Sequence, residues 1–257
     1  TMHFQTLSNI NVENKTVLLR ADLNVPTKDG NVTDFTRIDR LKDTIAYLTE
    51  KGAKTVILSH FGRPKGTRNE DFSLSFLPAV LKERWGTDVG FADDCIGNAA
   101  QNAISSMNSG DVLLLENVRF HAGEEKNDPA FAKDLAELGD IFVNDAFSAA
   151  HRAHASTEGL AHLLPTAAGF LMEAELTALN DALENPQKPV MAIVGGAKIS
   201  TKLELLNNLV QKVDKLVLGG GMANTFMYAN GLEVGKSLCE KDMKDEALKI
   251  IETAKAS

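Results

Sequence analysis

The sequence of 257 residues is 44% hydrophobic and 24% charged, a composition typical of a globular chain that is long enough for two domains. Its formal net charge of −8 argues against a nucleic acid partner, because phosphate backbones recruit surplus Lys and Arg. No apolar run approaches the ~20 residues of a membrane span, so we expect no membrane partner. Cys95 and Cys239 lie far apart and outside any metal-ligand spacing, so we interpret both as packing residues of a cytoplasmic protein.

Short apolar runs along the chain predict β-strands. They cover residues 16–21, 53–59, 111–116, 140–145, 189–195 and 215–220. Most of these runs are continuously apolar, which is typical of strands buried on both faces of a parallel sheet.

Amphipathic patterns between the strands predict helices. The clearest begins at Thr36, where apolar residues recur at helical spacing behind a Thr-x-x-Asp cap and before Gly52. Further patterns lie near 73–84, 128–138, 170–185, 199–212 and 241–256. Alternating strands and helices predict a doubly wound α/β architecture, with ligands expected beyond the carboxyl ends of the strands.

The first strand ends in an unusual way. The stretch LLRADLNVP, residues 18–26, places Arg20, Asp22 and Asn24 two residues apart, and Pro26 then ends the run. Alternate residues of a strand point to the same face, so an extended chain would project all three polar groups to one side. This stretch alone leaves two interpretations open, a strand end that solvates its last side chains or the edge of a binding site.

Arginine follows each of the next three strands. His60 and Arg63 lie in SHFGRPKG after the second strand, Arg119 comes after the third, and Arg152 comes after the fourth. Arg37 stands at the start of the first long helix. A guanidinium group supplies paired donors that match phosphate or carboxylate, so four arginines at such positions in an acidic chain predict one shared anion site.

The second half carries glycine-rich junctions. In AIVGGAKISTKLELLNN a glycine pair precedes Lys198 and Lys202, which would share a face if both lay in the first turns of a helix. Neither the Walker A pattern nor G-x-G-x-x-G is present. The second junction, LVLGGGMANTF, fits either a flat ligand lying against backbone or a tight turn.

Taken together, these segments resemble phosphoglycerate kinase in order and spacing across essentially all 257 residues. The segments are LLRADLNVP, SHFGRP, LLLENVRF, DAFSAAHRAHAS, GFLMEAEL, VGGAKISTKLELLNNL and LGGGMANTF. The resemblance implies the glycolytic enzyme, a phosphotransferase with a carboxyl acceptor that moves a phosphoryl group reversibly between ATP and 3-phosphoglycerate, giving ADP and 1,3-bisphosphoglycerate. It implies Mg²⁺ bound with ATP or ADP, no metal ligand among the protein residues, and a monomer.

The resemblance also implies site residues. Substrate-binding positions are Asp22, Leu23, Asn24, Arg37, His60, Phe61, Gly62, Arg63, Arg119 and Arg152. Nucleotide-binding positions are Gly196, Ala197, Lys198, Lys202 and Gly221, and the catalytic positions are Arg37, Lys198 and Lys202. Arg20 is not among the implied ligands, so we interpret it as structural.

The same resemblance implies two Rossmann-like parallel-sheet domains. We expect a substrate domain at 1–172, a linking helix at 173–186 and a partial nucleotide domain at 187–257. Family members are longer and carry a later acidic residue and a Gly-Gly-Asp-Thr loop at the phosphates, so we expect the 257-residue chain to be inactive alone.

Two other functions stay open at this point. The chain could be a non-enzymatic fragment that binds a phosphate ligand without turning it over. A Rossmann-type dehydrogenase shares the architecture, but the missing dinucleotide fingerprint and the loop arginines count against it.

Overall fold

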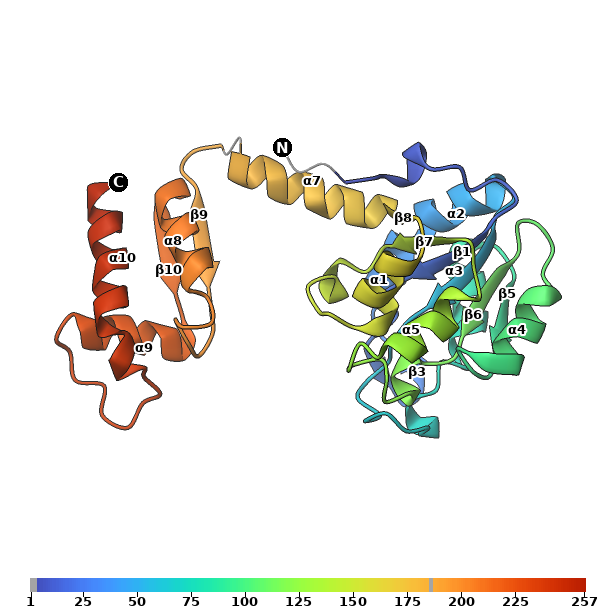
Figure 1. Ribbon diagram of the computed structural model, residues 1–257, viewed down its shortest axis with the longest axis horizontal. Helices are drawn as coiled ribbons and strands as arrows, with labels where there is room; N and C mark the ends of the chain where they lie inside the picture. Colours follow the sequence, from blue (N-terminus) through green and yellow to red (C-terminus); the bar gives the residue numbers. More distant parts are fainter. Residues whose placement is uncertain (1–3, 185–186) are drawn as a thin grey trace. The chain divides into compact units, whose positions relative to one another are not determined.

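The computed structural model describes residues 4–184 and 187–257 (Figure 1). The chain divides into two compact units, unit 1 up to Thr177 and unit 2 from Ala178 to Ser257. The division falls inside helix α7 (Phe170–Glu184), in the region where we expected a linking helix at 173–186. The last two residues of that expected helix, 185 and 186, lie outside the described residues.

Unit 1 is built on a six-stranded parallel sheet with the order β5-β6-β4-β1-β7-β8. Its strands are β1 (Thr16–Arg20), β4 (Lys54–Leu58), β5 (Val89–Ala92), β6 (Val112–Leu115), β7 (Ile141–Asn144) and β8 (Thr166–Ala168). The first four predicted strands are confirmed as β1, β4, β6 and β7, and the α/β fold class is confirmed with them. The sequence patterns missed β5 and β8, and also a small antiparallel hairpin of β2 (Thr27–Lys28) and β3 (Asn31–Val32).

Two hydrophobic clusters cover opposite faces of this sheet. In β1, Val17 and Leu19 point into one cluster while Leu18 points into the other, and all three are fully buried. The first cluster includes residues of α1, α2 and α3, and the second includes residues of α4, α5 and α6. These helices are α1 (Thr36–Arg40), α2 (Lys42–Glu50), α3 (Leu77–Trp85), α4 (Gly97–Ser105), α5 (Pro129–Ala136) and α6 (Leu160–Leu163). Burial on both faces explains why the strands read as continuous apolar runs.

The first long helical pattern forms two helices rather than one. Helix α1 ends at Arg40 and α2 begins at Lys42, although the apolar positions keep one helical spacing across both. The predicted cap was wrong. Thr36 is already helical, and Asp34 instead accepts hydrogen bonds from the backbone nitrogen and the hydroxyl of Thr36, at 2.9 and 2.6 Å. The aspartate two residues upstream therefore satisfies the helix start.

The strand order decides where polar side chains gather. Strands β6, β4, β1 and β7 are neighbours and parallel, so their carboxyl ends lie along one edge of the sheet. The segments after β4, β6 and β7 carry three of the predicted arginines, and the fourth, Arg37, lies in α1. Short 3-10 turns shape two of them, η3 (Val118–Phe120) after β6 and η4 (Phe147–Ala149) after β7.

Unit 2 has a small parallel sheet of β9 (Met191–Val194) and β10 (Lys215–Leu218), both of them predicted. Its helices are α8 (Leu203–Lys212), α9 (Gly220–Ala229) and α10 (Lys244–Ala256), with a 3-10 turn at Lys241–Met243. The three helices contribute to one hydrophobic cluster together with Val194. The expectation of strands buried on both faces was wrong here. Met191, Ile193 and Val217 are exposed, because the described helices pack against one face of this sheet only.

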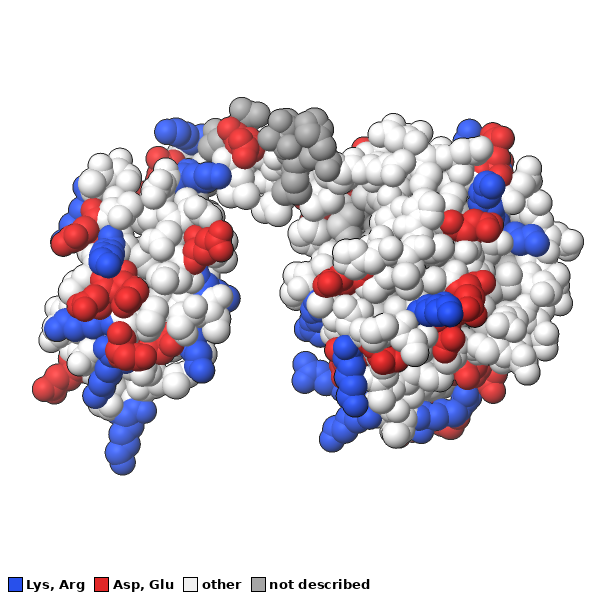
Figure 2. Space-filling model, viewed as in Figure 1, with Lys and Arg blue, Asp and Glu red and all other residues white. Residues whose placement is uncertain are grey.

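Charge is unevenly distributed on the surface. Figure 2 shows Lys and Arg side chains gathered at the lower edge of unit 1 in this view, while large areas above them are uncharged. Among the described residues, the helices are all too short or too polar to span a bilayer.

Candidate functional site

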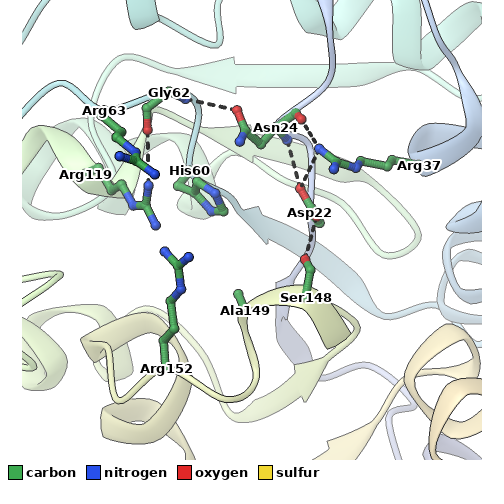
Figure 3. A pocket seen from close by; sticks show the side chains of 10 residues that line it. All are labelled: Asp22, Asn24, Arg37, His60, Gly62, Arg63, Arg119, Ser148, Ala149 and Arg152. Carbon is green, nitrogen blue, oxygen red and sulfur yellow. Dashed lines mark hydrogen bonds and ion pairs between the residues drawn. The ribbon is translucent and has the colours of Figure 1, made fainter. Parts of the chain in front are cut away.

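Ten residues of unit 1 surround a pocket of about 250 Å³ (Figure 3). They are Asp22, Asn24, Arg37, His60, Gly62, Arg63, Arg119, Ser148, Ala149 and Arg152. Eight of the ten are positions that the resemblance implied for substrate binding. The pocket contains four arginines and a single carboxylate, so it is strongly cationic in a chain whose formal net charge is −8.

Each side of the pocket comes from the end of a different strand. Asp22 and Asn24 follow β1, and His60 and Arg63 follow β4. Arg119 lies in the turn after β6, and the segment after β7 supplies the remaining side, as Figure 3 shows. The arrangement agrees with the general placement of ligand sites beyond the carboxyl ends of parallel strands.

Hydrogen bonds hold the β1 side of the pocket in place. Asp22 accepts from the backbone nitrogen of Asn24 at 3.0 Å and from the Ser148 hydroxyl at 2.6 Å. Arg37 donates to the Asn24 carbonyl, and its Nη1 lies 3.7 Å from Asp22 Oδ1. The Asp22 carboxylate is therefore oriented by three neighbours, and Arg37 is held at the mouth with about half of its side chain exposed.

The β4 side is tied to both of its neighbours. The backbone nitrogen of Gly62 donates to Asn24 Oδ1 at 3.0 Å, and Arg119 Nη1 donates to the Gly62 carbonyl at 3.1 Å. Gly62 has a φ of +61°, and a Cβ at this position would lie 2.3 Å from the Phe72 ring. A glycine is required here to let the backbone reach both partners.

Three of the arginines have little compensation from carboxylates. Within residues 4–184 and 187–257, Arg63 and Arg152 make no ion pair or side-chain hydrogen bond. Arg119 is buried, and burial lowers its pKa. Its Nε lies 3.5 Å from Glu125 Oε1 and has no hydrogen-bond partner among the described residues. Buried or converging donors without partners favour an anionic ligand.

His60 lies in the pocket wall as a neutral ring. Burial is the largest cause, and the nearby positive charges of Arg20, Arg119 and Arg152 add to it, so the pKa of His60 is lowered to about 2. Arg20 Nη2 donates to His60 Nδ1 at 2.9 Å. Because arginine has no acceptor, Nδ1 must be the acceptor and the ring proton must sit on Nε2. His60 therefore offers an N–H donor but no charge.

A buried network holds Arg20 behind His60. Arg20 is fully buried, and its Nε donates to the Ser156 hydroxyl at 2.8 Å. Ser156 in turn donates to Glu124 Oε2 at 2.5 Å, and its backbone nitrogen donates to Glu124 Oε1 at 2.7 Å. The interpretation of Arg20 as structural is consistent with these contacts. The partners on residues 124 and 156 could not be read from sequence.

Two predicted substrate positions do not line the pocket with their side chains. Leu23 is fully buried in the core, and Phe61 packs against the same cluster, with its ring 5.5 Å from that of Phe76. Their contribution to a ligand site would come from backbone atoms. Ser148 and Ala149 line the pocket but were not predicted, although both stand shortly before Arg152 in DAFSAAHRAHAS.

The predicted nucleotide positions lie in unit 2. Lys202 directly precedes α8, and its Nζ donates to the Gly195 carbonyl, whereas Lys198 lies exposed in the loop after β9. Lys198 and Lys202 therefore do not share a face of a helix, because α8 begins only at Leu203. Gly196 has a φ of +149°, a conformation that favours glycine.

The two glycine junctions of unit 2 pack against each other. The backbone nitrogen of Met222 donates to the Gly196 carbonyl at 3.0 Å. Added Cβ atoms at Gly220 and Gly221 would lie 2.7 Å from the Gly196 oxygen and 3.0 Å from the Ala197 oxygen. Gly220 and Gly221 are needed for this close approach of two backbones, which supports the tight-turn interpretation.

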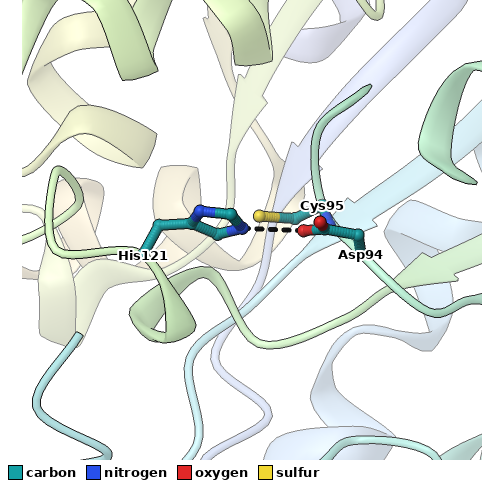
Figure 4. A group of neighbouring side chains, drawn as sticks. All are labelled: Asp94, Cys95 and His121. Atoms are coloured by element: carbon teal, nitrogen blue, oxygen red, sulfur yellow. Dashed lines mark hydrogen bonds and ion pairs between the residues drawn. The ribbon is translucent and has the colours of Figure 1, made fainter. Parts of the chain in front are cut away.

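A group of potential metal ligands lies outside the pocket. In the described part of the chain, Asp94, Cys95 and His121 form the one group of this kind, with ligand atoms all within 4.8 Å of one another (Figure 4). The interpretation of Cys95 as a packing residue is correct but incomplete. Its side chain belongs to the core, yet it also adjoins a carboxylate and an imidazole.

Comparisons with known proteins agree with this geometry. The family "Phosphoglycerate kinase" matches residues 7–257. Among curated relatives, the phosphoglycerate kinases of Rhodospirillum centenum and Rhodopseudomonas palustris are 63% and 62% identical over the whole of this chain. The chain spans 65% and 64% of the length of these two relatives.

Solved structures show the same similarity. Phosphoglycerate kinase from Coxiella burnetii has a TM-score of 0.80 at 45% identity, and covers 99% of this chain and 64% of its own. The enzyme from Pyrococcus horikoshii has a TM-score of 0.74 at 36% identity, over 98% of this chain and 64% of its own. The match of family, sequence and fold extends over nearly every residue, and the chain therefore belongs to the phosphoglycerate kinase family.

Proposed function

We propose that this chain binds 3-phosphoglycerate in the cationic pocket of unit 1, that the whole protein transfers a phosphoryl group reversibly between ATP and the substrate carboxylate, and that the 257-residue chain alone is inactive. The products would be ADP and 1,3-bisphosphoglycerate, as in the glycolytic phosphotransferase. One observation carries the proposal, namely that eight residues expected to bind this substrate surround a single pocket of about 250 Å³. Family membership supports it, and the activity and substrates of the whole protein remain part of the proposal.

The substrate carries two anionic groups, and the pocket offers donors for both. Arg63, Arg119 and Arg152 would bind phosphate and carboxylate oxygens through paired N–H groups. His60 would add a neutral N–H donor from Nε2, which needs no counter-charge. Asp22 and Asn24 would orient the substrate hydroxyl, since the Asp22 carboxylate is an acceptor already fixed by Ser148.

The chemistry requires no general base. The attacking group is a carboxylate, which is ionised at pH 7 and needs no proton removed. No acid–base pair is therefore expected in the pocket, and His60 with a pKa of about 2 could not serve as a base at neutral pH. Catalysis would instead come from positioning and from charge stabilisation of the transferring phosphoryl group.

The cationic groups take different parts in that task. Arg37 and Lys198 would stabilise charge in the transition state, because both are exposed and, among the described residues, neither has a carboxylate at hydrogen-bond distance. Lys202 would bind nucleotide phosphates. Backbone groups of Gly196, Ala197 and Gly221 would lie against the nucleotide.

The side chains around Lys198 and Lys202 determine whether the protein itself could bind Mg²⁺. Mg²⁺ prefers oxygen ligands and is usually held through substrate phosphates and one or two carboxylates. The described residues contain no group of three ligating side chains near these lysines. Mg²⁺ would therefore enter with the phosphates of ATP or ADP, where it neutralises phosphate charge.

Three further expectations belong to this proposal. We propose that residues 1–172 act as the substrate domain and 187–257 as part of the nucleotide domain, with 173–186 linking them. We also propose a monomeric, cytoplasmic protein. Light scattering on the purified chain would test the monomer, with a dimer mass contradicting it.

A ligand series tests the substrate assignment. Protein-observed NMR of unit 1 resonances should show binding of 3-phosphoglycerate, and much weaker binding of inorganic phosphate or of lactate, which carry only one of the two anionic groups. The difference arises because separate arginines bind the two ends. Equal affinities for all three ligands would contradict the assignment and leave an unspecific anion site.

A further inference from the structure

We propose that Asp94, Cys95 and His121 form a binding site for a thiophilic divalent cation of the Zn²⁺ class, outside the pocket assigned to the substrate. The three side chains come from two loops separated by α4 and β6, one after β5 and one directly after the turn η3. Their ligand atoms converge as shown in Figure 4. None of the three lines the substrate pocket, so the site is independent of the proposed function.

The donor set is one that zinc prefers. Thiolate, imidazole and carboxylate are its usual protein ligands, and three protein ligands with one open position form a complete tetrahedral set when water fills the fourth. One imidazole nitrogen of His121, one carboxylate oxygen of Asp94 and the Cys95 Sγ all lie within 4.8 Å of one another. Metal–donor distances of about 2.0–2.3 Å place donors about 3–4 Å apart, so movements on the order of 1 Å would close the site.

The Asp94–His121 pair is already in place. His121 Nε2 lies 2.7 Å from Asp94 Oδ1, and the His121 ring stacks on Phe131 with centroids 5.1 Å apart. Asp94 Oδ1 also accepts from the Cys95 backbone nitrogen at 2.7 Å, which fixes the carboxylate beside the thiol. Asp94 and His121 are therefore held side by side before any ion binds, and a bound ion would take the place of the proton between Nε2 and Oδ1, which would be released to solvent.

The surroundings of the thiol favour a cation. Cys95 is fully buried, and its backbone nitrogen donates to Asp94 Oδ1 at 2.7 Å, so the Asp94 carboxylate lies next to the thiol. This negative charge would stabilise a divalent cation bound beside the sulfur. On binding, the cation replaces the thiol proton, which is released to solvent as the S–metal bond forms.

An ion could reach this site from solvent. The side chains of Asp94 and His121 are 43% and 30% exposed, so the open coordination position would face water rather than the core. Cys95 would then bind the ion from the core side, and Asp94 and His121 would bind it from the solvent side. An arrangement with one open position fits exchangeable metal better than a closed structural site.

The second cysteine of the chain provides a matched control. Cys239 is partly exposed in unit 2, and its Sγ lies 3.9 Å from the Asn224 carbonyl. In the described residues it belongs to no group of three ligating side chains. Any metal bound by a single thiol alone should therefore prefer the more exposed Cys239.

Cobalt titration of the reduced 257-residue chain tests the site. Co²⁺ should produce a near-ultraviolet thiolate-to-metal absorption band that Zn²⁺ displaces. The band should vanish in Cys95→Ala and stay unchanged in Cys239→Ala. The His121→Gln variant, which keeps the core cysteine, should bind Co²⁺ about 10-fold or more weakly, and near-ultraviolet circular dichroism checks that each variant is folded.

Three results would overturn the proposal. One is the absence of a thiolate band at saturating Co²⁺. The second is a band that persists in Cys95→Ala and is lost in Cys239→Ala, which places the metal in unit 2. The third is an unchanged affinity in a folded His121→Gln variant, which would remove the imidazole from the site even if the Cys95 variant failed to fold.

Discussion

Arg20 Nη2 donates a hydrogen bond to His60 Nδ1 at 2.9 Å, and both side chains are buried. This hydrogen bond sets the tautomer and the charge of His60, which lies in the pocket wall. A fully buried arginine that contacts the ring disfavours its protonation and leaves Nε2 as the only N–H of the imidazole. His60 is therefore a fixed hydrogen-bond donor rather than a titrating group.

The first prediction concerns this tautomer. In ¹⁵N-resolved NMR of the histidine side chains, His60 should show a pyridine-type Nδ1 and a pyrrole-type Nε2, with no change between pH 5 and 8. His151 is exposed and serves as an internal comparison from the same chain. A pyrrole-type Nδ1, or a His60 shift that titrates near neutral pH, would show that Arg20 does not hold the ring as described.

A second prediction follows for stability against pH. The pKa of His60 is about 2 in the folded chain and 6.5 ordinarily, so below pH 6.5 the unfolded chain binds a proton that the folded chain does not. The free energy of unfolding should therefore fall as pH decreases from about 6.5 towards 2, with up to about 1.4 kcal/mol per pH unit from this group, and be unaffected by it at higher pH.

His60→Asn isolates that contribution, because the Asn oxygen can still accept from Arg20 but does not titrate. Urea unfolding at several pH values should show a shallower pH dependence in the variant than in the parent chain between pH 6 and 4. Identical slopes would mean that His60 is protonated equally in the folded and unfolded states.

The third prediction separates two residues of the β1 side by kinetics. In a full-length protein that has kinase activity, Arg37→Ala should lower kcat by about 10²-fold or more, since its charge would act on the transition state. Asp22→Asn should instead act mainly through KM for 3-phosphoglycerate, because its carboxylate orients a bound hydroxyl. Near-normal turnover without Arg37, or a pure kcat effect at Asp22, would reverse these roles.

The fourth prediction uses two adjacent glycines of unit 2. Gly220 has a φ of +69° and an added Cβ would lie 2.7 Å from the Gly196 oxygen, whereas an added Cβ at Gly219 meets nothing within 4 Å. Gly220→Ala should lower the free energy of unfolding by about 1–3 kcal/mol, since strain and a backbone clash combine. Urea denaturation should show a much smaller effect for Gly219→Ala, and equal effects would contradict the close approach of the two junctions.

Much of unit 1 could be predicted because its strands bury both faces. Continuous apolar runs marked β1, β4, β6 and β7, and the segments after the last three carried Arg63, Arg119 and Arg152. By contrast, β5 includes the exposed Gly90 and α9 begins with glycines, so neither has a strong periodic pattern. Local propensity is a weak guide where tertiary contacts decide.

The candidate site could likewise be predicted from the sequence only in part. Charged residues placed after strands could be predicted, because a long cationic side chain in an acidic sequence stands out. Ser148 was missed, since a single serine in a loop is common and its hydrogen bond to Asp22 spans 126 residues. The orientation of His60 by Arg20, across 40 residues, likewise depends on the folded chain.

Calorimetric titration of the 257-residue chain with 3-phosphoglycerate tests the central claim most directly. The parent chain should bind, with affinity that falls as salt is added because the pocket is cationic. Arg152→Ala should weaken binding by about 10-fold or more, the effect of a lost charge-assisted hydrogen bond. Lys133→Ala, which removes an exposed charge on α5 away from the pocket, should leave affinity unchanged. A folded parent chain that does not bind, or equal losses in both variants, would contradict the assignment of the arginine pocket to this substrate.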